Sequence, residues 1–325
     1  MSNIEAIRNT ISKELQWLNS LMHDVLVSDN AFLNNIIDEN LKKTGKQIRP
    51  ILVILGAEVT AEANETVISA AAAIELLHNA SLIHDDVLDE SAKRRGVPTI
   101  NFLWDNQVAV LVGDYFVSRA LRCATDTGKI EIVRTMSKLG TDLSIGEIDQ
   151  IDHARKRTIR EESYFEIIKL KTASLFRSCM EVGCYAVEAD KHTTEVLSKY
   201  AELLGLCFQI RDDIFDYYDN TAALGKPTGN DLREGKVTLP LIHALESDKT
   251  AERNEMITLL DKDYLETEDI QKLVDYAKRH DGIEYAYGKM TEIRRQASEL
   301  VSLIPDCKAI RSLEAIFDYT IERNF

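Results

Sequence analysis

Residues 64–89 read NETVISAAAAIELLHNASLIHDDVLD, a stretch rich in Ala and Leu that contains neither Gly nor Pro. Both residues have high helix propensity and nothing interrupts the run, so we predict one long, largely buried helix. This helix ends on the acidic sequence Asp85-Asp86-Val87-Leu88-Asp89. On a helix, residues three and four positions apart lie on the same face, so these carboxylates are expected to gather there.

The same acidic pattern occurs a second time, as Asp212-Asp213-Ile214-Phe215-Asp216. Carboxylates on a mostly apolar helix are costly to desolvate unless they are paired or bound to a metal. Grouped carboxylate oxygens suit a hard cation such as Mg²⁺, which also takes ligands from substrate phosphates. A single copy in so acidic a chain is explained more simply as a solvated helix face. Two copies, each within apolar sequence, favour metal binding and predict a diphosphate held through several metal ions.

Helical periodicity dominates the rest of the chain, beginning with apolar residues from Ile4 to Leu18 at spacings of three and four. No stretch shows the sustained apolar and polar alternation of a half-buried strand. We find no internal repeat and no Pro/Ser-rich linker. We therefore predict an all-α fold, with one domain over residues 1–325 and a peripheral N-terminal helix at residues 1–25. The expected helices cover residues 4–22, 64–89, 104–124, 129–153, 161–188, 192–218, 238–247 and 267–302.

Composition excludes several classes of function. The 325 residues include 39 Lys and Arg against 54 Asp and Glu, a net charge of −15, which argues against non-specific nucleic-acid binding. Five cysteines without a C-x-x-C pair suggest reduced thiols and a cytoplasmic location. No run approaches the roughly 18 apolar residues of a membrane span, and the N-terminus does not resemble a signal peptide. We therefore expect no stable membrane insertion.

Positive residues stand beside chain breakers or acidic stretches, where they could contact phosphate. Taken singly, each is as well explained by an exposed or core side chain. The residues concerned are Lys46 and Arg49 in a turn between Gly45 and Pro50, Arg94 and Arg95 after the first acidic stretch, His78 two turns before it, and Lys171-Thr172. Gln209 projects from the same face as the second acidic stretch. The Gly-rich loop from Gly225 to Gly229, carrying Lys226, is a candidate mobile lid.

Together these stretches closely resemble the trans-isoprenyl diphosphate synthases, in the order and spacing of that family, from about residue 40 to the C-terminus. A medium- or long-chain polyprenyl diphosphate synthase is the nearest type. The strings that carry the resemblance are Gly45-Lys46-Gln47-Ile48-Arg49-Pro50, Leu82-Ile83-His84-Asp85-Asp86-Val87-Leu88-Asp89 with Arg94-Arg95-Gly96, Lys171-Thr172-Ala173, Phe208-Gln209-Ile210-Arg211-Asp212-Asp213-Ile214-Phe215-Asp216, and Gly225-Lys226-Pro227 followed by Gly235-Lys236.

The resemblance implies an antiparallel helix bundle, a homodimer, and two aspartate-rich motifs facing each other across a deep central cavity. It implies about three Mg²⁺ ions, bound by Asp85 and Asp89 on one side and Asp212 on the other, with Asp86, Asp213 and Asp216 in support. Isopentenyl diphosphate would be held by Lys46, Arg49, His78 and Arg95. The allylic diphosphate would be held by Arg94, Lys171, Thr172, Gln209, Lys226 and Lys236. Asp85, Asp89, Lys171, Asp212 and Lys226 are the expected catalytic group.

The implied reaction joins isopentenyl diphosphate head to tail to an allylic diphosphate by ionisation, condensation and elimination. Product length is expected to depend on the helix wall below the first acidic motif, at Leu77, Ala80 and Ser81. Short-chain members of the family tend to carry a bulky aromatic at one of the latter two positions. The small side chains here predict an open tunnel and an all-trans product longer than C20, such as a quinone side chain, which would be passed to membrane enzymes. Close helix packing is the other explanation.

Three alternatives remain open from the sequence. The first is a short-chain farnesyl or geranylgeranyl diphosphate synthase. A class I terpene cyclase is the second, although such enzymes usually replace the second acidic motif and need no second diphosphate site. The third is a non-catalytic subunit of a heteromeric synthase, which would be expected to have disabled metal motifs that this chain does not show.

Overall fold

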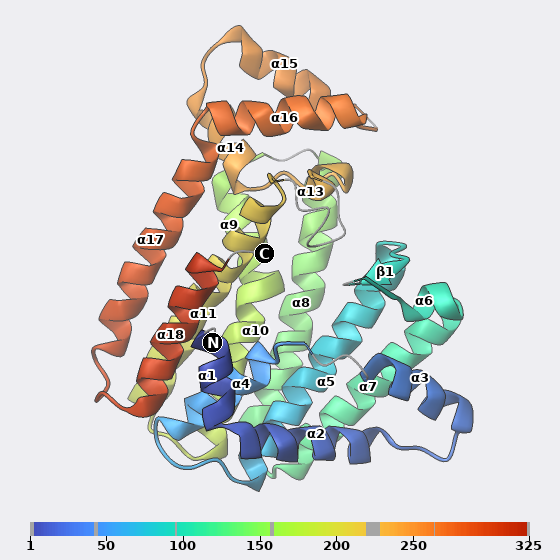
Figure 1. The fold of residues 1–325 in the computed structure, drawn as a ribbon, viewed down its shortest axis with the longest axis vertical. Helices are drawn as coiled ribbons and strands as arrows, with labels where there is room; N and C mark the ends of the chain where they lie inside the picture. Colours follow the sequence, from blue (N-terminus) through green and yellow to red (C-terminus); the bar gives the residue numbers. More distant parts are fainter. Residues whose placement is uncertain are drawn as a thin grey trace. The chain divides into compact units, whose positions relative to one another are not determined.

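In a computed structural model of the chain, residues 3–41, 45–94, 96–156, 159–218, 228–262 and 264–323 are described, and these are almost entirely helical (Figure 1). The all-α prediction is confirmed. The chain forms two compact units, which are described separately below. Unit 1 contains residues 1–140, 176–201 and 300–316, and unit 2 contains residues 141–175, 202–299 and 317–325.

Unit 1 is built on helix α5, Glu65–Leu88, the helix predicted over residues 64–89. Asn64 caps its start, since the side-chain oxygen accepts a hydrogen bond from the Val67 backbone N–H at 3.1 Å. Its most extensive contact is with α7, which runs beside it in Figure 1, and it also packs on α4 and α2. The helices wholly within this unit are α1 (Asn3–Thr10), α2 (Ser12–Leu26), α3 (Ala31–Leu41), α4 (Ile48–Glu58), α5, α6 (Ile100–Leu103) and α7 (Asn106–Asp126).

Among the described residues, α5 is the one helix long and apolar enough to cross a membrane by length and composition. The sequence predicts no membrane span because no unbroken apolar run has that length, whereas the average hydropathy of α5 reaches the range of such a span. In the structure, 61% of the most apolar window of α5 is buried inside the fold. A core helix of a globular unit has the same properties, so this helix is weak support for a membrane span.

Unit 2 supplies the remaining helices. Those wholly within it are α9 (Glu161–Ile168), the π-helical turn η1 (Lys169–Ala173), α13 (Asn230–Arg233), α14 (Leu239–Ser247), α15 (Ala251–Leu260) and α16 (Thr267–Arg279). Five longer helices contribute residues to both units: α8 (Ile130–Lys156), α10 (Ser174–Ala186), α11 (Lys191–Phe215), α17 (Gly282–Val301) and α18 (Lys308–Glu322).

The structure breaks three of the predicted helices, and the break in 161–188 is described with the candidate site. The segment 4–22 divides at Ile11, and the segment 267–302 divides between α16 and α17. At the break between α16 and α17, Asp281 has a left-handed backbone with φ of 56°. A Cβ on Gly282 would lie 2.2 Å from the Pro240 carbonyl oxygen, so the backbones meet closely there. The spacing of apolar residues predicts neither the left-handed residue nor the close backbone contact. A two-stranded antiparallel ribbon, β1 (Lys93–Arg94) with β2 (Val97–Pro98), was also not predicted.

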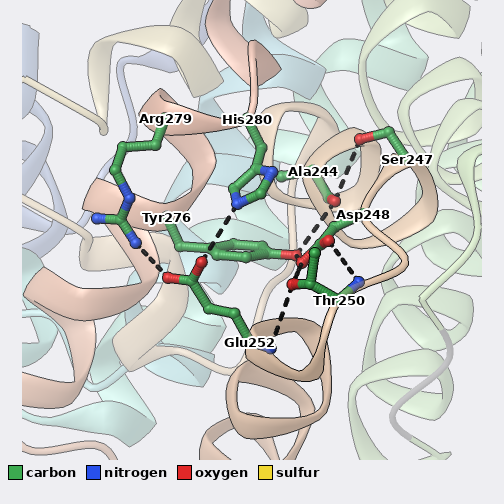
Figure 2. Close-up of polar contacts among 8 residues, drawn as sticks. All are labelled: Ala244, Ser247, Asp248, Thr250, Glu252, Tyr276, Arg279 and His280. Atoms are coloured by element: carbon green, nitrogen blue, oxygen red, sulfur yellow. Dashed lines mark hydrogen bonds and ion pairs between the residues drawn. The ribbon is translucent and has the colours of Figure 1, made fainter.

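A polar cluster joins α14, α15 and α16 in unit 2 (Figure 2). The buried Tyr276 hydroxyl donates a hydrogen bond to Asp248 Oδ2 at 2.9 Å. Asp248 also accepts from the Thr250 backbone N–H at 2.7 Å, and Glu252 contacts Arg279. Burial acts to raise the pKa of Asp248, but the hydrogen bonds from Thr250 and Tyr276 outweigh it and lower that pKa below its ordinary value.

We expect Tyr276→Phe to lower the Tm at neutral pH by about 2–4 °C. Because the pKa of Asp248 is depressed in the folded state, its ionised form stabilises the fold above the unfolded pKa of about 3.9. That contribution disappears as pH falls through the lower folded value. The Tm difference between variant and parent should therefore shrink below about pH 4, measured by circular dichroism. The exposed Tyr264, changed to Phe, is the control and should leave Tm unchanged.

Candidate active site

The π-helical turn Lys169–Ala173 in unit 2 carries the Lys171-Thr172 pair. The sequence predicted one continuous helix over 161–188, whereas the structure has α9, this turn and then α10. Single π-turns are frequent at functional sites. Helix α8 approaches the turn closely, because a Cβ on Gly146 would lie only 2.9 Å from the Lys171 backbone nitrogen.

Helix α8 also holds the Lys171 side chain. Its Nζ lies 2.5 Å from Glu147 Oε2 and 3.2 Å from Gln150 Oε1. Neither Glu147 nor Gln150 was singled out from the sequence, because nothing in it shows that α8 lies against the turn. These two contacts hold the ammonium group of Lys171 against Glu147 and Gln150 on the surface of α8.

The second acidic motif lies at the C-terminal end of α11, and each of its carboxylates has its own set of partners. Both oxygens of the buried Asp213 accept hydrogen bonds, from the Tyr164 hydroxyl at 2.6 Å and the Gln209 amide at 2.7 Å. Asp216 accepts from the backbone N–H groups of Asn230 and Asp231, at 2.9 Å each. Both oxygens of each of these two carboxylates therefore accept a hydrogen bond from the protein.

The Asp212 side chain is 42% exposed, and it contacts Arg323 near the end of the chain. The Arg323 guanidinium lies over the Phe208 ring, 4.2 Å from its centroid, and the Arg323 carbonyl accepts from Arg211. The Arg323 guanidinium is therefore a counter-ion of Asp212. The role of Arg323 was not predicted, since 111 residues separate it from Asp212.

A cavity of about 590 Å³ in unit 2 brings several predicted site residues together. The ones that line it are Lys171, Thr172, Gln209, Asp213 and Lys236, and they come from three separate stretches of sequence. Burial raises the pKa of Asp213 to about 7 against the hydrogen bonds of Tyr164 and Gln209, which lower it. Asp212 and Asp216 on the same helix raise it further. Lys236 lies 2.5 Å from Glu234 Oε2.

The first acidic motif lies at the C-terminal end of α5 in unit 1. Asp86 is buried and its Oδ1 accepts a hydrogen bond from Arg94 Nε at 2.9 Å, which draws the β1 strand onto the motif. The side chain of Asp85 is half-buried and that of Asp89 is exposed at the end of the helix. Arg94, predicted to hold the allylic diphosphate, is thus a neighbour of the first motif.

The remaining predicted residues of unit 1 lie on α4 and α5 or just before α4. Lys46 is exposed in the turn before α4, and the Arg49 guanidinium lies 5.9 Å from the centroid of the Phe176 ring. His78 is buried on α5. Of the predicted chain-length wall, Ala80 is fully buried, whereas Leu77 and Ser81 are half-buried.

Two predicted residues, Arg95 and Lys226, lie outside the described residues, as does most of the candidate lid. Within the described part of the chain, no three Asp, Glu, His or Cys side chains are grouped closely enough to hold a metal ion. The metal and substrate roles given above to individual residues therefore stay predictions.

Comparison with known proteins places this arrangement in a family. The polyprenyl synthetase family model matches residues 30–277. The octaprenyl diphosphate synthase of Haemophilus influenzae is 30% identical over 325 residues, which cover 100% of this chain and 98% of that protein. The chain therefore belongs to the polyprenyl synthetase family. It is a prenyltransferase with the all-α isoprenoid synthase fold.

Two solved structures are also similar over the whole length. A polyprenyl synthase from Caulobacter crescentus, complexed with calcium and isoprenyl diphosphate, has 28% identity and a TM-score of 0.89, with 98% of each chain covered. A geranylgeranyl pyrophosphate synthase from Bacteroides thetaiotaomicron has 34% identity and a TM-score of 0.85, with 100% of each chain covered. Relatives with long and short products thus resemble this chain to a similar degree.

The close approach of α8 to the π-turn gives a test of the site's geometry. In Gly146→Ala the new methyl group would press on the Lys171 backbone and on Leu170, so we expect the turn to shift. Displacing groups that position a substrate by a fraction of an ångström should lower prenyl transfer roughly tenfold or more.

Gly140→Ala on the same helix is the matched control, because a Cβ there meets nothing within 4 Å. It should raise stability by up to about 1 kcal/mol through helix propensity and leave the rate unchanged. Equal rates in the two variants would show that α8 does not set the position of Lys171. Initial rates with radiolabelled substrate and thermal unfolding provide the two measurements.

Proposed function

We propose that the chain is a Mg²⁺-dependent all-trans polyprenyl diphosphate synthase that condenses isopentenyl diphosphate with an allylic primer. We further propose that its product is longer than C20. The observation that carries the proposal is the cavity of unit 2. Lys171, Thr172, Gln209 and Lys236, each chosen from sequence as a diphosphate ligand, line that one cavity with Asp213 of the second acidic motif.

The available donors fit a hard divalent cation. Carboxylate oxygens of Asp85, Asp89 and Asp212 would bind Mg²⁺, which commonly uses one or two carboxylates and completes its shell with waters and substrate phosphates. This explains why a preformed group of three protein ligands is not required. Both acidic motifs end their helices, where the macrodipole adds negative potential that favours a cation. The bound metal would neutralise charge on the departing diphosphate.

The residues of the chain provide binding and electrostatic stabilisation in this mechanism, and none acts as a nucleophile. Lys171 and Lys236 carry positive charge to the diphosphate as its allylic C–O bond ionises. Thr172 and Gln209 orient its oxygens. The double bond of isopentenyl diphosphate, held by Lys46, Arg49 and His78, attacks the carbocation. A proton then passes to the released diphosphate, and the walls exclude water that would quench the cation.

The direct test uses the purified chain with Mg²⁺, labelled isopentenyl diphosphate and a farnesyl or geranylgeranyl primer. We expect label in polyprenyl diphosphates and no turnover after EDTA treatment. A cyclic hydrocarbon without label would indicate a terpene cyclase instead. Absence of turnover by the chain alone would indicate a subunit of a heteromeric synthase. Chromatographic sizing of the products decides between long-chain and short-chain activity.

We also propose a homodimer. Helices α6 and α7 expose Phe102, Leu103, Val110 and Leu111, with exposed fractions of 61, 49, 40 and 67%. A gathering of large apolar side chains on the surface is typical of a protein interface. Light scattering should then give a mass of twice 36.7 kDa.

A further inference from the structure

A chain of three hydrogen bonds in unit 2 links a predicted diphosphate ligand to a tyrosine that the sequence did not single out. Thr172 Oγ1 donates to Gln209 Oε1 at 2.7 Å. Gln209 Nε2 donates to Asp213 Oδ1 at 2.7 Å, and the Tyr164 hydroxyl donates to Asp213 Oδ2 at 2.6 Å. All four side chains line the same cavity. The chain begins on α9, passes through α11 and ends on the π-turn.

The direction of these bonds fixes the orientation of the Gln209 amide. The NH₂ side of the amide donates to Asp213 Oδ1. The amide oxygen then faces Thr172, whose hydroxyl proton it accepts. One N–H of the Gln209 amide remains, and it has no acceptor among the described residues. Because Gln209 lines the cavity, this N–H can serve an anionic oxygen bound there.

We propose that Tyr164 is a positioning residue for the diphosphate group of the allylic substrate. By holding Asp213, it keeps the Gln209 amide turned so that its second N–H reaches a diphosphate oxygen. This inference rests on the proposed function, since it concerns the substrate of the same site. It assigns a role to the hydroxyl group of Tyr164 rather than to its ring.

Burial makes this role more than a packing contact. Tyr164 is 7% exposed and Asp213 is 4% exposed, so water does not readily replace the tyrosine hydroxyl. A buried carboxylate oxygen that loses its donor is left unsatisfied, and the cost of this favours a rotation toward the donor that remains. For Asp213 the remaining donor is Gln209, whose amide would be drawn away from Thr172. The loss would therefore be transmitted to the two side chains predicted to orient the diphosphate.

The test is Tyr164→Phe, which keeps the ring and removes the hydroxyl. We expect kcat/KM for the allylic primer to fall roughly tenfold to a hundredfold. The KM for isopentenyl diphosphate should stay within about twofold, because its predicted ligands are Lys46, Arg49 and His78. This separation between the two substrates would not arise from a general loss of stability.

Tyr276→Phe is a matched control in the same unit. Tyr276 is also buried and also donates to a carboxylate, Asp248, but neither residue lines the cavity. We expect it to change Tm without changing either kinetic constant. If the parent chain makes polyprenyl diphosphate and the Tyr164 variant shows the primer kinetics of the Tyr276 variant, the positioning role is wrong. An inactive parent chain would instead contradict the proposed function.

A double-mutant cycle identifies the route of the effect. If Tyr164 acts through Asp213, adding Tyr164→Phe to Asp213→Asn should lower kcat/KM for the primer by less than about twofold, far less than it does alone. Full additivity of the two changes would show that Tyr164 contacts the substrate by another route and would overturn the proposed hydrogen-bond chain. Thermal unfolding of each variant confirms that the comparison is made on folded protein.

Discussion

Asp85→Ala is expected to lower polyprenyl diphosphate formation about a thousandfold, a loss of several kcal/mol of transition-state stabilisation. Asp85 lies in the last turn of α5, where its backbone carbonyl accepts from Asp89 at 2.8 Å, and its side chain is half-buried. Removing the carboxylate would take away the proposed metal ligand at the place where the helix dipole also favours a cation. The backbone hydrogen bond does not use the side chain, so the helix end should persist.

The Tm of Asp85→Ala shows whether the loss of rate is due to misfolding. Alanine has a higher helix propensity than aspartate, so the Tm of the variant should equal or exceed that of the parent. Asp24→Ala on α2 provides the control, because its side chain is 74% exposed, and it should retain the parental rate. A rate near that of the parent in Asp85→Ala would contradict the metal role. Raising the Mg²⁺ concentration should restore part of the lost rate only if the remaining carboxylates still bind the ion.

The sequence predicted the helices well where one periodic pattern runs without interruption, as in α5 and α11. It failed where tertiary contacts decide the backbone. The left-handed Asp281 and the close approach of Gly282 to Pro240 depend on α14, which is distant in sequence. The π-turn at Lys169–Ala173 depends in the same way on Gly146 of α8. A helical pattern cannot reveal either contact.

The candidate site shows the same division. The roles predicted for Lys171, Thr172 and Gln209 came from the family resemblance, which the strings Lys171-Thr172-Ala173 and Phe208–Asp216 help to carry. Their partners were not identifiable. Tyr164 lies 49 residues from Asp213, and the surrounding residues Glu162-Ser163-Tyr164-Phe165-Glu166 give no sign of that contact. Sequence motifs can thus suggest which groups contact substrate, whereas the partners that orient those groups require the fold.

The second large effect that we expect concerns product length, and it follows from which side chains of α5 are buried. Asp85, Ser81 and Leu77 are spaced four residues apart, so they form one stripe along the helix. All three are half-buried. Ala80 lies off this stripe and is fully buried. The two small residues predicted to form the wall are therefore not equivalent, since Ser81 is partly accessible and Ala80 is not.

Ser81→Phe should shift the products toward shorter chains, because a phenyl ring one turn below Asp85 would block a growing hydrocarbon tail. The hydroxyl it replaces donates only to the His78 carbonyl, at 2.9 Å, so the fold should tolerate the loss. Ala80→Phe would place the same ring in filled space and should lower stability by about 1–3 kcal/mol. Ser81→Ala, which adds no bulk, should leave product length unchanged.

Chromatographic sizing of products made from farnesyl and geranylgeranyl primers gives the comparison. Shortening in Ser81→Phe with an unchanged Tm would place the growing chain along the Asp85 stripe. If Ala80→Phe shortened the product and Ser81→Phe did not, the tail would run along the opposite side of that stripe. An unchanged distribution in both variants would exclude this part of α5 as the wall. Both variants add the same phenyl ring to the same helix. A difference in product length between them therefore reports the direction in which the ring leaves α5.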